Sequence, residues 1–395
     1  MSVDVKTLTV GVPRETYPGE RRVALIPAAV AALRKAHVNV VIESGAGIES
    51  GFADADYSAS GVKVLASRGE IFSTADVILQ VRAAGANRNI GQADFALLRS
   101  GQVLIGLCDP FAEPSLMSQL AERNVSCFAL ELLPRITRAQ SMDVLSSQAS
   151  LAGYKAVLLA ANELPRLFPM MMTAAGTIAP AKVFIMGVGV AGLQAIATAK
   201  RLGAVVKAYD IRPAVKDEVL SLGAKFVELD MKAGDTATAG GYAKAMDEEF
   251  YRRQRELLSQ VVAESDIVIT TAAVPGKKAP MLVTADMARK MPKGSILIDL
   301  AAEQGGNCEL TRPNETVVEA GVRIIGCVNI SSTVPGHASQ LYARNISTFL
   351  LSLVKEGQLA LNLNDEVVSN TLVTHGGHVV HPKLRETLGM SAVVS

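Results

Sequence analysis

Short apolar runs alternate with longer amphipathic segments along the first third of the chain. The apolar runs occupy residues 8–12, 38–42, 75–81, 103–107 and 125–130. Residues 27–36 and 113–123 lie between such runs and repeat their apolar side chains at helical spacing. Strands that alternate with helices in this way predict a mostly parallel sheet with both faces covered.

The same alternation returns in the second half of the chain. Its apolar runs occupy residues 182–186, 204–209, 226–229, 266–270, 295–300 and 322–326. A polar stretch over residues 135–150, expected to be a loop, leads into a helix to about residue 161, and together they separate the two regions. A long amphipathic helix begins at residue 336, and Leu372 and Val373 are expected to return as a strand to the first domain.

Three glycines follow the run at 182–186 with the spacing GxGxxG. Gly187 allows a tight turn, Gly189 lets the backbone approach a pyrophosphate, and Gly192 lets the next helix pack closely. The helix that begins near Val190 offers free N–H groups and a favourable dipole to an anion. The motif therefore predicts a bound dinucleotide, and the alternative is a glycine turn at a helix start that binds nothing.

The second strand of this unit ends in Asp210, Ile211 and Arg212. A carboxylate at this position accepts hydrogen bonds from the ribose hydroxyls of NAD and repels the 2′-phosphate of NADP. Arg212 complicates the choice, because an arginine nearby can accommodate that phosphate. We expect NAD(H) as the bound cofactor, with these three residues among its ligands.

These patterns predict an α/β protein with two Rossmann-like domains that contain parallel sheets. The first domain should comprise residues 1–145 plus 336–395, and the second residues 146–335. Two long helices should join the domains, with the cofactor in the interdomain cleft. A chain of 395 residues is long enough for such an arrangement.

Composition and charge exclude several functions. The formal net charge of +1 provides no attraction to nucleic acid. The four cysteines lack metal-ligand spacing and indicate reduced, mostly buried thiols. The C-terminal sequence HGGHVVH is expected to be a tail feature, so we predict no metal site. The N-terminus lacks the pattern of a signal peptide, and no apolar run is long enough to cross a membrane.

Five motifs in one order carry a family resemblance, namely GVPRETYPGERRVALIP, PRITRAQSMD, GVGVAGLQA, TTAAVPGKKAP and DLAAEQGGNCE. Together they resemble the NAD(H)-binding domain of proton-translocating NAD(P) transhydrogenase. That domain is itself similar to alanine dehydrogenase. The resemblance covers nearly the whole chain, so the question is which branch the chain follows.

Departures from the alanine dehydrogenase pattern favour the transhydrogenase branch. Gln80 and Arg82 stand where that enzyme has two lysines, and LIGLCDP lacks its catalytic histidine. Glu303 replaces a substrate-site aspartate, and only Arg22 matches the substrate-binding arginine. Oxidation of an amino acid needs a positioned proton acceptor. Hydride transfer between two nicotinamides needs aligned rings and exclusion of water.

The transhydrogenase resemblance implies that Arg135, Gln140, Asp143 and Ser146 lie beside the nicotinamide. These side chains suit the donors and acceptors of a carboxamide, a phosphate and a ribose. The alternative for this segment is a polar loop that caps a helix. Tyr242 lies in a Gly- and Ala-rich segment that corresponds to a mobile loop over the nucleotide, or else it anchors that loop to the surface.

The resemblance also implies a Re/Si-specific transhydrogenase. Hydride passes between NAD(H) on this chain and NADP(H) on a partner subunit, coupled to proton movement through a membrane subunit. The chain itself should be soluble, homodimeric and peripheral on the cytoplasmic side of the inner membrane.

Two other functions stay open at this point. A stand-alone NAD-dependent dehydrogenase for alanine or a related amino acid would form NADH without a partner. A nucleotide sensor would bind NAD(H) and transfer no hydride.

Overall fold

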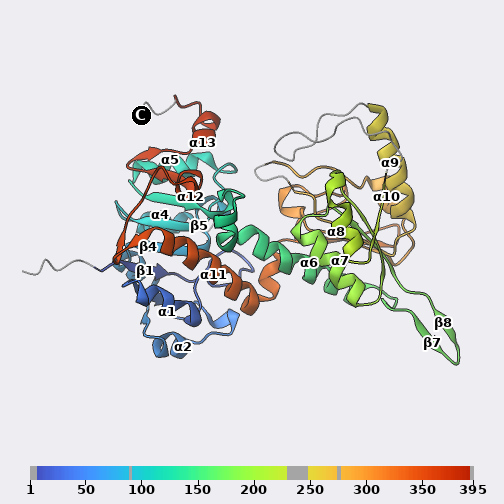
Figure 1. Cartoon of the computed structure of the whole chain (residues 1–395), viewed down its shortest axis with the longest axis horizontal. Helices are drawn as coiled ribbons and strands as arrows, with labels where there is room; N and C mark the ends of the chain where they lie inside the picture. The colour runs from blue at the N-terminus through green and yellow to red at the C-terminus, as the bar shows by residue number, and fades with distance from the viewer. Residues whose placement is uncertain (1–6, 89–90, 229–247, 274–276, 392–395) are drawn as a thin grey trace, which may run out of the picture. The chain divides into compact units, whose positions relative to one another are not determined.

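The computed structural model describes residues 7–88, 91–228, 248–273 and 277–391. The chain forms two compact units, Met1–Gln148 with Ser331–Ser395, and Ala149–Ile330. Each unit contains its own large β-sheet, which confirms the predicted α/β architecture with two domains (Figure 1).

The chain passes between the units at two points. The first lies inside helix α6 (Val144–Glu163), and the second lies in the 3₁₀ turn η7 (Ile330–Thr333). The sequence predicted these passages after residues 145 and 335. Helix α11 (Pro335–Ser352), expected as the second joining helix, lies within the first unit.

The sheet of the first unit has eight strands in the order β19-β18-β6-β5-β4-β1-β2-β3. Strands β1 to β6 pair in parallel, as predicted, and β18 joins β6 antiparallel at the edge. The strands are β1 (Thr9–Val12), β2 (Asn39–Glu43), β3 (Lys63–Leu65), β4 (Val77–Arg82), β5 (Val103–Leu107), β6 (Ser126–Ala129), β18 (Leu372–His375) and β19 (His378–Val379). The expected return of Leu372 and Val373 to this domain is therefore seen in β18.

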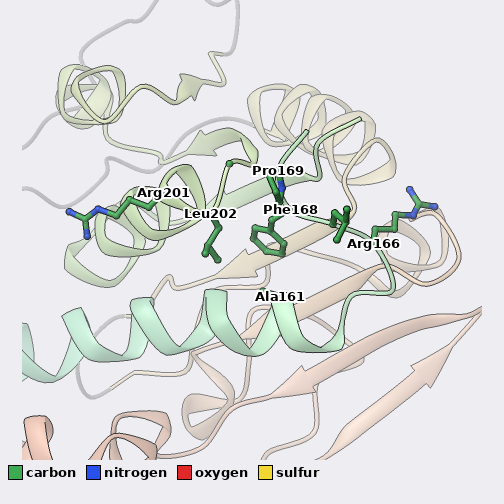
Figure 2. Close-up of a pocket in the computed structure, with 8 residues that line it drawn as sticks. Ala161, Arg166, Phe168, Pro169, Arg201 and Leu202 are labelled. Carbon is green, nitrogen blue, oxygen red and sulfur yellow. The ribbon is translucent and has the colours of Figure 1, made fainter. Parts of the chain in front are cut away.

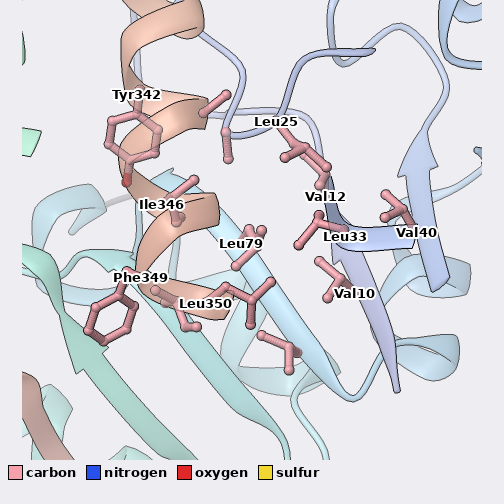
Figure 3. Packing of buried hydrophobic residues seen from close by; sticks show 14 of the residues in the cluster. Val10, Val12, Leu25, Leu33, Val40, Leu79, Tyr342, Ile346, Phe349 and Leu350 are labelled. Atoms are coloured by element: carbon pink, nitrogen blue, oxygen red, sulfur yellow. The ribbon is translucent and has the colours of Figure 1, made fainter. Parts of the chain in front are cut away.

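Helices cover both faces of this sheet. On one face, Val10, Val12 and Leu79 of the strands pack against side chains of α1 and α11 (Figure 3). On the other face, side chains of α3 and α5 bury the opposite strand positions. The helices of this unit are α1 (Pro27–Lys35), α2 (Asp54–Ala59), α3 (Arg68–Thr74), α4 (Gln92–Leu97), α5 (Pro114–Glu122), α11, α12 (Glu366–Thr371) and α13 (Pro382–Thr387).

The sheet of the second unit has seven strands in the order β11-β10-β9-β12-β13-β15-β14. All pair in parallel except β14, which is an antiparallel edge strand. The strands are β9 (Lys182–Met186), β10 (Val205–Tyr209), β11 (Lys225–Phe226), β12 (Ile267–Thr270), β13 (Ile296–Asp299), β14 (Thr316–Glu319) and β15 (Val322–Gly326).

The second half of α6 and helix α7 bury one face of the second sheet, and α9 and α10 bury the other. The helices that follow α6 are α7 (Val190–Arg201), α8 (Lys216–Ser221), α9 (Glu248–Ala263) and α10 (Ala285–Arg289). Two small hairpins complete the fold, β7 (Met171–Thr173) with β8 (Gly176–Ile178), and β16 (Val354–Lys355) with β17 (Gln358–Leu359).

All four cysteines are free thiols, and Cys108, Cys127 and Cys308 are buried. Within the described part of the chain, no helix is both long enough and apolar enough to span a bilayer.

Candidate functional site

The glycine turn lies where the strand order of the second unit reverses. Strands β10 and β11 lie on one side of β9, and β12 and β13 lie on the other. In open α/β sheets, the carboxyl ends of the strands at such a switch point form the ligand-binding crevice. Gly187 follows β9 directly, so the fold places the turn where a nucleotide is expected.

The three glycines of the turn have different surroundings. Gly187 adopts a φ of +99°, and a Cβ there would lie 2.7 Å from Thr271 Oγ1. A Cβ on Gly192 would lie 2.0 Å from the carbonyl oxygen of Gly187, so α7 packs tightly against the turn. A Cβ on Gly189 would meet nothing within 4 Å. The open space beside Gly189 and exposed Val190, at the N-terminus of α7, fits the close approach of a pyrophosphate.

Asp210 follows β10 and connects it to the glycine turn. Its Oδ2 accepts a hydrogen bond from the backbone N–H of Val188 at 2.7 Å. Its Oδ1 accepts hydrogen bonds from the backbone N–H and Nε of Arg212 at 2.9 and 3.0 Å. Burial opposes ionisation of this carboxyl, but the hydrogen bonds from Arg212 and Val188 outweigh it and lower the pKa of Asp210. The carboxylate is therefore ionised at neutral pH and lies at the predicted ribose position, followed by exposed Ile211.

Two residues that the sequence did not single out hold the neighbouring loops in place. Thr271, directly after β12, donates a hydrogen bond from its hydroxyl to the carbonyl of Gly187 at 2.9 Å. The side chain of Asn307 bonds the N–H and the carbonyl of Ala272 at 3.0 and 2.8 Å. Both lie in motifs that carried the family resemblance, TTAAVPGKKAP and DLAAEQGGNCE, and this was the available signal.

The polar segment of the first unit is more ordered than a loop. Residues Thr137–Met142 form a 3₁₀ helix, η4, and α6 begins at Val144. Asp143 Oδ1 accepts a hydrogen bond from the N–H of Ser146 at 2.9 Å, and Oδ2 accepts one from its hydroxyl at 2.6 Å. The structure brings these two predicted residues together as the cap of α6. Arg135 and Gln140 are exposed on the same segment.

Two contacts fix this polar segment to the C-terminal part of the first unit. Arg138 forms a bidentate ion pair with Asp365, both distances being 2.8 Å. Asn345 of α11 donates a hydrogen bond to the carbonyl of Ser141 at 2.8 Å. The exposed side chains are therefore presented from an anchored backbone.

Arg22 is buried and fully engaged by the chain itself. Its Nε and Nη2 donate to the Glu20 carboxylate at 2.7 and 2.6 Å, and its Nη1 donates to Gln148 and Ser331 at 2.9 and 3.2 Å. Burial opposes ionisation of Glu20, but the charge and hydrogen bonds of Arg22 outweigh it and lower the pKa of Glu20 to about 2. Arg82 also lies near this carboxylate, at 3.6 Å, and covers the ring of Tyr17.

The remaining positions that distinguish the chain from alanine dehydrogenases carry structural contacts. Gln80 donates a hydrogen bond to Asp94 at 3.1 Å, and Glu303 accepts one from the backbone N–H of Asn329 at 2.7 Å. Cys108 is buried, and its contact with Cys127 together with burial raises the pKa of its thiol. All three side chains are thus engaged in contacts within the chain.

A surface hollow of about 530 Å³ in the second unit lies away from the glycine turn. Figure 2 shows Phe168 and Leu202 over Ala161 of α6, with Arg166 and Arg201 at the edges. Arg201 ends α7, so the length of that helix, about 18 Å for its 12 residues, separates the hollow from the turn. The hollow is not part of the predicted nucleotide site.

Tyr242 lies outside the described residues. Among the described residues, no group of His, Cys, Asp and Glu side chains could hold a metal ion. In the sequence HGGHVVH, His375 instead bonds the hydroxyl of Ser126 at 2.9 Å.

Comparisons with known proteins agree with this geometry. Residues 11–152 match the family described as alanine dehydrogenase/PNT, N-terminal domain, and residues 156–382 match the corresponding C-terminal domain. An NAD(P) transhydrogenase alpha subunit of Rhodospirillum rubrum is 47% identical over 95% of this chain and 99% of its own length. The alanine dehydrogenase of Mycobacterium tuberculosis is 28% identical over 97% of each chain. The crystal structure of a transhydrogenase from Sinorhizobium meliloti superposes with a TM-score of 0.84 at 46% identity, covering 94% of this chain and 100% of that one.

Proposed function

Because this chain belongs to the alanine dehydrogenase/PNT family, we propose that it is the NAD(H)-binding component of a proton-translocating transhydrogenase. The observation that carries the proposal is the glycine turn, with open space beside Gly189 and the ionised carboxylate of Asp210 at the end of the next strand. The higher identity to a transhydrogenase subunit than to an alanine dehydrogenase supports the choice of branch.

The second unit holds the adenosine and pyrophosphate half of the cofactor. Gly187, Gly189 and Gly192 bring the backbone and the N-terminus of α7 to the phosphates, beside Val190. Asp210 accepts the ribose hydroxyls, and its neighbours Ile211 and Arg212 flank the adenosine. This arrangement needs no cationic side chain at the pyrophosphate, because the free N–H groups of the helix favour the anion.

The polar segment of the first unit holds the nicotinamide half. When bound there, NAD(H) would supply the hydride donor or acceptor for exchange with NADP(H) on a partner subunit. Asp143 and Ser146 offer acceptors and a hydroxyl for the carboxamide, and Arg135 and Gln140 offer planar donors to phosphate or ribose oxygens. The work of these residues is alignment, which suits hydride transfer between two rings.

The buried groups around Arg22 support this reaction over amino-acid oxidation. A dehydrogenase of that kind must remove a proton from its substrate. Cys108 lies in the segment where alanine dehydrogenases place a histidine, and its contact with Cys127 together with burial disfavours its thiolate. The guanidinium of Arg22 is bound by Glu20, Gln148 and Ser331. We expect no NADH formation from alanine by this chain, and alanine-dependent reduction of NAD would favour the dehydrogenase instead.

The functional assembly contains further subunits. An NADP(H)-binding subunit receives or donates the hydride, and a membrane subunit conducts protons, so this chain is peripheral on the cytoplasmic side of the inner membrane. This chain forms a homodimer in the proposed assembly. Exposed apolar side chains on and beside the β7–β8 hairpin support it, namely Met170, Met171, Met172 and Ile178.

Equilibrium binding of NADH and NADPH to the isolated chain tests the cofactor assignment. We expect saturable binding of NADH and much weaker binding of NADPH, because Asp210 repels a 2′-phosphate. Absence of NADH binding would refute the proposed function.

A further inference from the structure

The Asp210 carboxylate is fully occupied by hydrogen bonds from its own chain. A carboxylate offers about four lone-pair positions. One is used by the backbone N–H of Val188 and one by the backbone N–H of Arg212. The Arg212 side chain uses the other two, through Nε on Oδ1 at 3.0 Å and Nη2 on Oδ2 at 3.1 Å. Two ribose hydroxyls can therefore bind only where the Arg212 side chain now binds.

The Arg212 side chain is well placed to move. It is 43% exposed, whereas the Asp210 side chain is 7% exposed. A longer hydrogen bond of 3.3 Å links its Nη2 to the carbonyl of Val188 in the glycine turn. The guanidinium thus covers the carboxylate from the solvent side, between the end of β10 and the turn.

We propose that Arg212 is able to bind a 2′-phosphate, and that its ion pair with Asp210 masks it by occupying its guanidinium. This inference rests on the proposed function. When NAD(H) binds, its two ribose hydroxyls replace the two side-chain bonds of Arg212. The guanidinium moves off the carboxylate and stays beside the adenosine, while Asp210 keeps both backbone bonds. The number of hydrogen bonds to Asp210 is unchanged by this exchange.

The charges explain why the masked arginine does not admit NADP(H). The Asp210 and Arg212 side chains together are neutral. A 2′-phosphate carries between one and two negative charges and would have to separate the pair and then lie next to Asp210. Without the Asp210 charge, the same guanidinium becomes a free planar donor, the group that best recognises a phosphate.

Binding measurements on the full chain test the inference. The probes are NADH, NADPH and their adenosine fragments, 5′-AMP and adenosine 2′,5′-bisphosphate. Calorimetry measures the affinity of each probe. The variants are Asp210→Asn, which keeps an acceptor for the N–H of Val188, and Asp210→Ala. Each is also made together with Arg212→Ala. Asp217→Asn is the matched control, because it removes an exposed carboxylate near Arg212 in the sequence with the same change of net charge.

We expect both Asp210 variants to bind adenosine 2′,5′-bisphosphate and NADPH about tenfold or more tightly than the parent chain, since a charged hydrogen bond is gained. They should bind 5′-AMP and NADH more weakly. The gain for the phosphorylated ligands should vanish in the double variants and should not occur in Asp217→Asn.

Three outcomes would overturn the inference. One is NADPH affinity that stays at the parent level in both Asp210 variants, while the parent chain binds NADH. Another is a gain that persists without Arg212, and the third is an equal gain in Asp217→Asn. Failure of the parent chain to bind NADH or 5′-AMP would instead remove the proposed function on which the inference rests.

Discussion

Gly192 lies against the carbonyl group of Gly187, so close that a Cβ on Gly192 would come within 2.0 Å of that oxygen. This contact fixes the first turn of α7 to the end of β9. Gly189, between them, faces open space and has an ordinary backbone conformation with a φ of −86°. One glycine of the motif thus serves the fold, and another leaves room for a ligand.

This difference predicts that one alanine substitution lowers stability and the other weakens ligand binding. Gly192→Ala should lower the free energy of unfolding by about 1–3 kcal/mol or more, because the added methyl group overpacks the turn. Gly189→Ala should leave stability within about 1 kcal/mol of the parent, since its methyl group meets nothing in the protein. It should nevertheless weaken NADH binding about tenfold or more, because the methyl group occupies the space next to the pyrophosphate. Chemical denaturation and calorimetry measure the two effects, and normal NADH affinity in Gly189→Ala would contradict the assignment of the site.

Asp143 should matter for hydride transfer more than for folding. Asp143→Asn keeps an oxygen for the N–H of Ser146, so we expect a stability loss of less than about 1 kcal/mol. Hydride transfer in the presence of an NADP(H)-binding partner should fall about tenfold or more. The amide of asparagine has one oxygen and cannot accept hydrogen bonds from both the N–H and the hydroxyl of Ser146 as the two carboxylate oxygens do. Thr284→Ala is the matched control. It removes the cap of α10, in which the Thr284 hydroxyl accepts a hydrogen bond from the N–H of Met287, and should leave turnover unchanged. Equal losses of turnover in both variants would mean that Asp143 acts only as a helix cap.

The buried pair of Arg22 and Glu20 predicts that removing one partner destabilises the protein strongly and that removing the second charge restores stability. Arg22→Met should cost about 3–5 kcal/mol, because it removes the guanidinium that binds both oxygens of the buried Glu20 carboxylate. Combining it with Glu20→Gln should recover most of that loss, since no charge is then buried alone. Urea denaturation at neutral pH compares the two variants. If the double variant is as unstable as Arg22→Met, the loss comes from packing and not from the charge.

Glu131 predicts a specific pH dependence of stability. Its Oε1 accepts hydrogen bonds from the N–H groups of Cys108 and Asp109, and burial raises the pKa of its carboxyl from 4.5 to about 7. A group whose pKa is raised on folding favours the folded state at pH values below its unfolded pKa. That contribution is lost as the pH rises from about 4.5 to about 7. Glu15, with a pKa raised to about 8 by burial and by the charge of Glu20, acts in the same direction.

Glu131→Gln should therefore flatten part of this profile. The glutamine keeps the oxygen that accepts both N–H groups and has no proton to lose. A pKa shift of one unit corresponds to about 1.4 kcal/mol. Between pH 4.5 and pH 8, we therefore expect the free energy of unfolding of the variant to rise by about 2–3 kcal/mol relative to the parent. Thermal unfolding across this range measures the slope. An unchanged slope would mean that Glu131 is not the group that titrates.

Long apolar runs made most of the fold predictable from the sequence. The central strands β1, β5, β9, β12 and β13 fall within predicted runs, and β4 extends one residue beyond its run, because a buried parallel strand must be apolar on both faces. The short edge strand β3, the exposed strands β7 and β8, and the partly exposed edge strand β14 carried no such signal and were missed. The polar stretch was predicted as a loop to residue 150, whereas Asp143 caps a helix that begins at Val144.

The site was predictable where a single residue type is required by geometry. Gly187, Gly189 and Gly192 lie together at the turn because their spacing already encodes it. The ion pair between Asp210 and Arg212 was not predictable, since the sequence shows two neighbouring ligands and not their mutual bonds. The role of Thr271 depends on strand order, which places the end of β12 beside the end of β9.

The most direct test of the proposed function is hydride transfer from NADH to a spectrally distinct NADP analogue. The reaction is followed with this chain alone and again after addition of an NADP(H)-binding transhydrogenase subunit. We expect turnover only when the partner is present, because this chain binds one of the two nicotinamides. Tight binding of NADH with no turnover in either case would contradict that account and would favour a nucleotide sensor.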